Sequence, residues 1–125
     1  MNDKRPMNLD LTTMHFPIMA IASILHRISG VLLFLYVPFI LWLFDQSLSS
    51  STQFLNIQGA CCEPWMKWLI WLFLAALFYH LVAGIRHLCM DFGIGDSLKG
   101  GRLGAQLTIG LTIVLILLAG VWLWW

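Results

Sequence analysis

Three polar side chains, Ser23, His26 and Arg27, lie together near the start of a long apolar stretch of the chain. On a helix, Ser23 shares a face with His26 and Arg27, because residues three and four apart are neighbours on the helix surface. The hydroxyl can hydrogen-bond a carbonyl oxygen, the guanidinium can bind an anionic or carbonyl oxygen, and the imidazole can exchange protons near neutral pH. The spacing predicts a site for a polar head group, although an interfacial anchor would also explain Arg27.

A second set of residues, His80, Gly84, His87 and Asp91, recurs at steps of four, three and four, which places all of them on one helical stripe. An imidazole inside an apolar helix needs a partner. Gly84 leaves room beside His80 for a large planar ligand or for a closely packed helix. Because histidine is a common axial ligand of haem in helical proteins, the stripe indicates a haem site with His80 on the iron. A buried, hydrogen-bonded histidine beside a packing glycine remains the alternative.

The elements that position these residues follow from the composition. The chain has 125 residues, 60% hydrophobic and 10% charged, whereas soluble domains carry roughly 25% charged residues. Roughly 20 apolar residues cross a bilayer as a helix, and residues 21–44, 65–88 and 104–124 meet this length. The sequence predicts an all-α membrane protein with three transmembrane helices, up-down-up. No basic run suggests a nucleic-acid partner, and the three cysteines form neither a disulfide framework nor a zinc spacing.

The distribution of basic residues and tryptophans predicts the orientation of the spans. Lysine and arginine accumulate on the cytoplasmic side of membranes. Basic residues precede the first span and surround the connection between the second and third: Lys4, Arg5, Arg86, Lys99 and Arg102. Residues 1–20 and 89–103 are therefore expected to be cytoplasmic, and the loop 45–64 and the C-terminus periplasmic. All seven tryptophans fall toward the periplasmic end. We expect a bacterial inner-membrane protein, because residues 1–20 lack the features of a signal or transit peptide.

Two motifs resemble those of a known family. Arg5-Pro6 and Ser23-Ile24-Leu25-His26-Arg27-Ile28-Ser29 are similar to the pattern R-P…S-x-x-H-R-x-[ST], and residues 80–91 are similar to H-x-x-x-G-x-R-H-x-x-x-D. Both patterns belong to the large cytochrome b membrane-anchor subunit of succinate dehydrogenase, respiratory complex II. The three-span plan also agrees, so the resemblance covers nearly the whole chain and looks closest to proteobacterial members.

The resemblance implies an anchor that is no enzyme by itself and contributes to a quinone-reduction site. It implies a lipid-embedded heterodimeric helix bundle with a smaller anchor subunit. Electrons would come from a flavoprotein subunit through an iron–sulfur subunit docked on the cytoplasmic face. The cofactor would be haem b, and ubiquinone the substrate.

The resemblance also implies roles for single residues. His80 matches the axial ligand of the haem iron, and Ser23 and Arg27 match residues that line the ubiquinone head-group pocket. Asp91 matches an acid suggested to deliver protons toward the quinone. Positions near the haem propionates are matched by His26 and Arg27. For His87 two roles stay open, a hydrogen bond to a propionate in the same region or packing against a neighbouring helix.

A haem bound by two histidines needs a second ligand besides His80. From Ile28 to Phe44 the chain has 17 residues without a charge, which span about 25 Å of helix. His26 is therefore expected near the cytoplasmic boundary, and His80 about two turns deeper. Because these two histidines are then poorly placed to face each other across one iron, the second ligand is expected from the smaller anchor subunit.

Three other functions remain open. The chain could anchor a quinol:fumarate reductase, which menaquinone in the purified complex would favour. It could be a haem-free proton or solute transporter subunit that uses His80, His87 and Asp91 as a relay, which a colourless protein would favour. It could also be a purely structural anchor, whose complex would reduce quinone normally after Arg27→Ala or Ser23→Ala.

Overall fold

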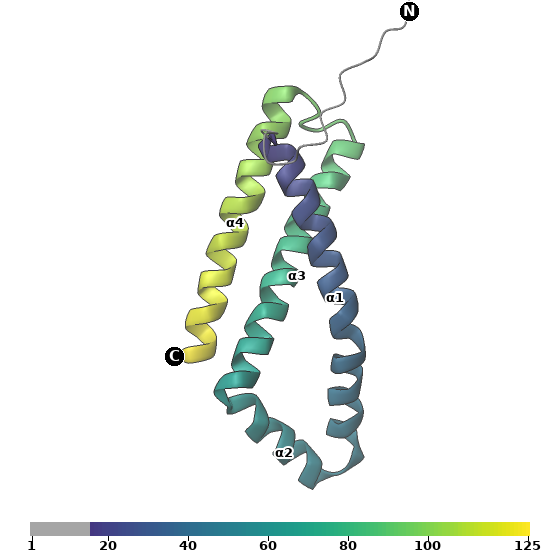
Figure 1. Ribbon diagram of the computed structural model, residues 1–125, viewed down its shortest axis with the longest axis vertical. Helices are drawn as coiled ribbons and strands as arrows, with labels where there is room; N and C mark the ends of the chain where they lie inside the picture. Colours follow the sequence, from purple (N-terminus) through teal and green to yellow (C-terminus); the bar gives the residue numbers. More distant parts are fainter. Residues whose placement is uncertain (1–15) are drawn as a thin grey trace, which may run out of the picture.

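The computed structural model describes residues 16–125, which form four helices and no strand. They are α1 (Ile18–Ser49), α2 (Ser51–Cys62), α3 (Pro64–Asp91) and α4 (Leu98–Trp124). Figure 1 shows α1 and α4 running in one direction and α3 running in the opposite direction, which confirms the up-down-up all-α fold. These three helices are long and apolar enough to cross a membrane. Lys4, Arg5 and Pro6 lie outside the described residues.

The expected loop at residues 45–64 is wrong, because most of this segment is helical. The first long helix continues to Ser49, and α2 occupies most of the remaining segment across one end of the bundle (Figure 1). Ser50 begins α2 as its N-cap, and its Oγ accepts a hydrogen bond of 3.1 Å from the backbone N–H of Gln53. Pro64 then begins α3 at a position that needs no N–H donor. The serines and glutamines therefore mark a polar helix, none of whose residues is buried.

The connection between α3 and α4 is shorter than the expected 89–103. The third helix continues to Asp91, and α4 already begins at Leu98. Gly93 and Gly95 both have φ of 77°, a conformation that glycine adopts without steric cost. Ser97 caps α4 by accepting from the N–H of Gly100. This tight return places the end of α3 beside the start of α4, at the same end of the bundle as the start of α1 (Figure 1).

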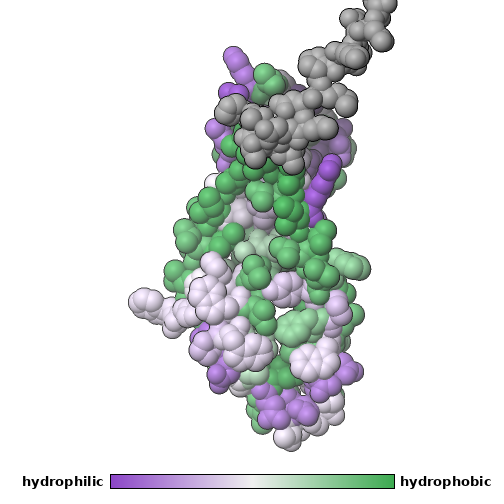
Figure 2. Space-filling view, in the orientation of Figure 1, coloured by the Kyte–Doolittle hydropathy of each residue, from purple (hydrophilic) through white to green (hydrophobic). Residues whose placement is uncertain are grey.

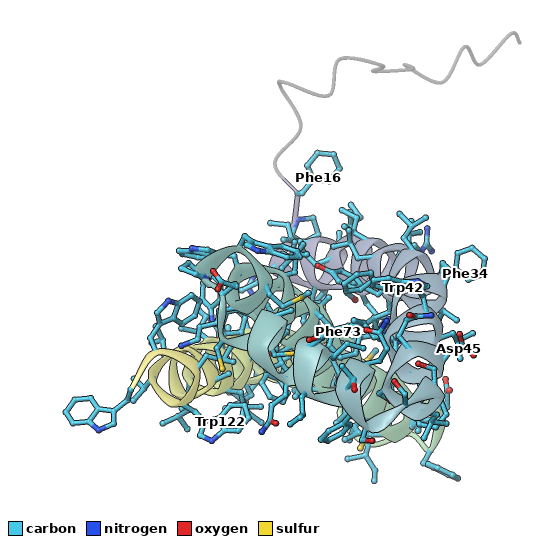
Figure 3. All side chains as sticks on the ribbon, turned by 90° about the horizontal axis from the view of Figure 1, so that it is seen from below. Phe16, Phe34, Trp42, Asp45, Phe73 and Trp122 are labelled. Atoms are coloured by element: carbon cyan, nitrogen blue, oxygen red, sulfur yellow. The ribbon has the colours of Figure 1, made fainter. Side chains whose placement is uncertain are left out.

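Small side chains form the interior of the bundle, and large apolar ones cover its outside. The buried apolar residues are mainly alanines: Ala22, Ala76, Ala83, Ala105 and Ala119. Small residues let helix backbones approach closely in a membrane. Phe34 and Trp122, which are 74% and 76% exposed, point away from the bundle (Figure 3). Figure 2 shows the apolar band between two more polar ends that suits lipid or another apolar protein surface.

Two tyrosines fix the level at which α1 packs against α3. The hydroxyl of Tyr79 donates to the carbonyl of Ala22 at 2.9 Å, and the hydroxyl of Tyr36 donates to the carbonyl of Leu69 at 3.2 Å. Since a hydroxyl inside a bilayer finds no water, such bonds between helices favour one register over others. This register decides which side chains of the two helices meet.

Tryptophans of α3 and α4 gather at one end of the bundle, as expected. The ring centroids of Trp68 and Trp124 lie 5.0 Å apart, and those of Trp71 and Trp124 lie 6.2 Å apart. The indole N–H of Trp71 also donates to the carbonyl of Ile116 at 3.0 Å. The ring fits because a Cβ on Gly120 would come within 3.2 Å of Trp71 Nε1.

We expect Trp71→Phe to lower the free energy of unfolding by roughly 0.6–2 kcal/mol, the range measured for hydrogen bonds between membrane helices. Trp122→Phe is the matched control, because this indole is exposed on α4. Unfolding by SDS in mixed micelles, followed by near-ultraviolet circular dichroism, measures both variants. Equal shifts for the two would show that the hydrogen bond to α4 contributes nothing.

Candidate functional site

The two polar clusters of the sequence meet where α1 packs against α3. The ring of His26 stacks on that of His80, with centroids 4.3 Å apart and an interplanar angle of 26°. The ring of His87 lies 5.0 Å from that of His26, at an interplanar angle of 34°. At Gly84, an added Cβ would lie 3.6 Å from Nε2 of His26. These four residues line a hollow of about 430 Å³. Its other walls are apolar: Leu81, Ile85 and Leu88.

One atom of the cluster lacks a partner. Nε2 of His26 is buried, and no hydrogen bond reaches it from any other part of residues 16–125. A buried polar atom without a partner costs free energy. The atom next to Gly84 is therefore suited to a polar group that enters the hollow. Within the same residues, no cluster of three or more His, Cys, Asp or Glu side chains is arranged to hold a bare metal ion.

The contact between His26 and His80 shows that the expected difference in depth is wrong. The expected depth places His80 six residues, about 9 Å of helix, inside Arg86 and takes this arginine as the membrane boundary. Arg86 is instead half-buried, and its guanidinium donates to the carbonyl of Gly101 on α4 at 3.3 Å. The two imidazoles lie at one level, but stacked rings do not point their nitrogens at each other as two ligands on opposite sides of one iron do. That the second ligand comes from elsewhere remains a prediction.

Ser29 and Gly30 hold the ring of His80, and sequence reasoning gave neither residue a role. Oγ of Ser29 lies 3.1 Å from Nδ1 of His80 and donates to the carbonyl of His26 at 2.8 Å. A Cβ on Gly30 would come within 3.1 Å of the ring's Cε1. The available signal was the last position of S-x-x-H-R-x-[ST], which Ser29 occupies one turn after His26.

The remaining candidates lie at the same end of the bundle but outside the hollow. Ser23 is half-buried on α1, and Arg27, one turn later, is exposed. Neither lines the hollow beside the histidines. Asp91 is the exposed last residue of α3. The structure therefore brings four of the predicted site residues together and leaves Ser23, Arg27 and Asp91 at the surface where α1 begins and α3 ends (Figure 1).

Comparison with known proteins agrees with the resemblance found in the motifs. Residues 1–119 match the family described as Succinate dehydrogenase/Fumarate reductase transmembrane subunit. A protein of Coxiella burnetii named succinate dehydrogenase cytochrome b556 subunit is 46% identical over 125 residues, which cover 99% of this chain and 100% of the relative. A protein of the same name from Rickettsia bellii is 40% identical over 101 residues (81% and 78% of the two chains), and one from Paracoccus denitrificans 32% over 120 residues (91% and 88%). Both the motifs and this similarity along almost the entire chain place it in one family: the chain belongs to the transmembrane subunits of succinate dehydrogenase and fumarate reductase.

Proposed function

We propose that this chain anchors a succinate dehydrogenase in a bacterial inner membrane, binds haem b together with a smaller anchor subunit, and forms part of the ubiquinone-reduction site. The observation that carries the proposal is the convergence of His26, His80 and His87 on the hollow beside Gly84. The relatives are named cytochrome b subunits, which supports a haem as the group that this chain binds.

The residues around the hollow fit a haem. A planar macrocycle already supplies most of the ligands of its metal, so this chain would need to contribute only one histidine. This agrees with the absence, among residues 16–125, of a cluster of three or more side chains that could hold a metal ion alone. His80 would bind the iron, and Gly84 would leave space for the ring. The unpaired Nε2 of His26, together with Arg27 and His87, would hold the propionates. When bound, the haem supplies a one-electron redox centre.

The half-buried Ser23 and the exposed Arg27 and Asp91, at the same end of the bundle, support quinone reduction. The hydroxyl of Ser23 would donate a hydrogen bond to a carbonyl oxygen of ubiquinone. The guanidinium of Arg27 would stabilise the negative charge that develops on this oxygen as electrons arrive. Reduction to the quinol consumes two electrons and two protons, and Asp91 at the exposed end of α3 would help to deliver the protons. The electrons would come from the iron–sulfur subunit, which the flavoprotein subunit supplies.

The surface of the bundle leaves room for the smaller anchor subunit. In the apolar windows of the three spans, only 6%, 11% and 17% of the residues are buried within this chain. The rest face either lipid or another protein. A second anchor that covers the hollow would add the second histidine and remove the haem from lipid. The N-terminus and the α3–α4 connection would face the cytoplasm, because basic residues gather in these two parts of the chain. The C-terminus would then face the periplasm.

Co-expression with the other subunits tests the proposal. Membranes that contain the whole complex should show a sharp b-type α band in a dithionite-reduced minus oxidised spectrum. This chain expressed alone should not retain haem stably, since it supplies one axial ligand. Stoichiometric haem in the isolated chain would contradict a shared site. A complex without any band would return the haem-free transporter and the structural anchor to consideration, and menaquinone in the purified complex would favour a fumarate reductase.

A further inference from the structure

We infer that Ser29 is a positioning residue that fixes the tautomer of His80, so that Nε2 is the ring nitrogen free to bind a metal. This inference rests on the proposed function, in which His80 binds the haem iron. It assigns Ser29 a task that differs from those of the head-group residues Ser23 and Arg27 on the same helix.

The proton of the Ser29 hydroxyl has a defined place. Ser29 is only 5% exposed, and its Oγ lies 2.8 Å from the backbone carbonyl of His26. A carbonyl oxygen accepts hydrogen bonds and never donates them, and a hydroxyl has a single proton to give. The proton of Ser29 therefore lies toward His26, and only the lone pairs of Oγ remain for other partners.

These lone pairs determine where His80 carries its own proton. Nδ1 of His80 lies 3.1 Å from Oγ of Ser29 and 3.3 Å from the carbonyl of His26. Both oxygens act as acceptors toward the ring, so Nδ1 must be the donor. A neutral imidazole has one N–H, which leaves the lone pair on Nε2. Within the described part of the chain, the recorded hydrogen bonds of His80 all involve Nδ1.

Gly30 completes a cradle for the ring within the same turn of α1. A Cβ at this position would lie 3.1 Å from Cε1 and 3.5 Å from Nδ1 of His80. The ring therefore packs close to Gly30, where any larger residue would crowd it. We use the name His80 cradle for Ser29, Gly30 and the carbonyl of His26.

The cradle has a consequence for a metal bound to Nε2. Hydrogen bonds donated by the second ring nitrogen orient an imidazole ligand and make it more basic, and loss of such a partner typically lowers metal affinity 10- to 100-fold. A more basic ligand stabilises oxidised iron over reduced iron. Removal of the Ser29 hydroxyl should therefore shift the haem midpoint potential to a more positive value and loosen the haem.

The test compares Ser29→Ala with Ser29→Thr in the assembled, purified complex. The readouts are the midpoint potential from a redox titration of the α band and the rate of haem transfer to excess apomyoglobin. For Ser29→Ala we expect a more positive potential and haem loss about 10-fold faster than in the wild type. Ser29→Thr keeps the hydroxyl and should restore both values.

Thr108→Val is the matched control, because Thr108 is another buried hydroxyl that donates to a carbonyl of its own helix, Gly104 at 2.9 Å. It belongs to α4 and does not line the hollow around His80. A wild-type potential and rate in Ser29→Ala, or equal changes in Thr108→Val, would overturn the inference. If Ser29→Ala does not assemble, Ser29→Cys replaces the hydroxyl with a thiol, whose sulfur is a weaker acceptor for Nδ1–H, and a wild-type potential there would equally overturn the inference.

The proposed function can fail separately. A wild-type complex without a b-type band, or a band that His80→Leu leaves unchanged, would show that His80 is not a haem ligand. That result would not depend on the effect of the Ser29 variants. A band that depends on His80 but is indifferent to Ser29→Ala would leave the proposed function intact and remove only the role of the His80 cradle.

Discussion

His80→Leu should abolish or strongly shift the b-type α band of the complex in a reduced minus oxidised spectrum of membranes. Leucine fills a similar space in α3 but offers no lone pair to iron, so the proposed haem ligand of this chain would be lost. The complex should still assemble, because the ring of His80 lies at the hollow and is not part of the alanine interior.

His87→Leu is the matched control for this experiment. It removes an imidazole that lines the same hollow, two turns further along α3, but that is expected to contact a propionate and not the iron. The α band should therefore persist in His87→Leu. A band that survives in His80→Leu would place the ligand elsewhere, and equal losses in both variants would show that the spectrum responds to general damage of the hollow.

Periodicity alone predicted the stripe of α3 that carries the site. The steps from His80 to Gly84 and His87 lie within one helix, so the geometry of a single helix decides their common face. The contact between His26 and His80 depends instead on the register of α1 against α3. Tyr79, 57 residues from its partner, helps to set this register, and no local pattern contains that information. The role of Ser29 was hidden for the same reason, since it exists only because α1 brings His80 to its hydroxyl.

The segment at residues 45–64 shows a different limit. Its serines, glutamines and asparagines are typical both of a loop and of a helix exposed on both sides. Composition could not distinguish a loop from an exposed helix here, because α2 buries no residue and therefore needs no apolar stripe. Ser50 and Pro64 are residue types that commonly begin helices, and both do so here. Such residues locate the ends of helices only when a helix is already expected.

Arg27→Ala should lower the rate of succinate-driven ubiquinone reduction roughly 10- to 100-fold, since a hydrogen bond to a charged group contributes about 1.5–3 kcal/mol. Arg27→Lys should lie between the wild type and alanine, because lysine keeps the charge but loses the planar fork of donors. Arg27 is exposed on α1, so its loss should leave folding unchanged. Electron transfer from succinate to a soluble artificial acceptor, which bypasses the membrane anchor, should also stay normal.

Arg102→Ala is the matched control for Arg27→Ala, because Arg102 is also an exposed arginine, near the start of α4 at the same end of the bundle. Loss of general surface charge would affect both variants, whereas loss of a contact to the quinone oxygen would affect only Arg27. Normal ubiquinone reduction in Arg27→Ala would contradict the head-group site and favour a structural anchor. A defect in ubiquinone reduction with a persisting haem band would show that Arg27 acts on the quinone oxygen in addition to its expected contact with a haem propionate.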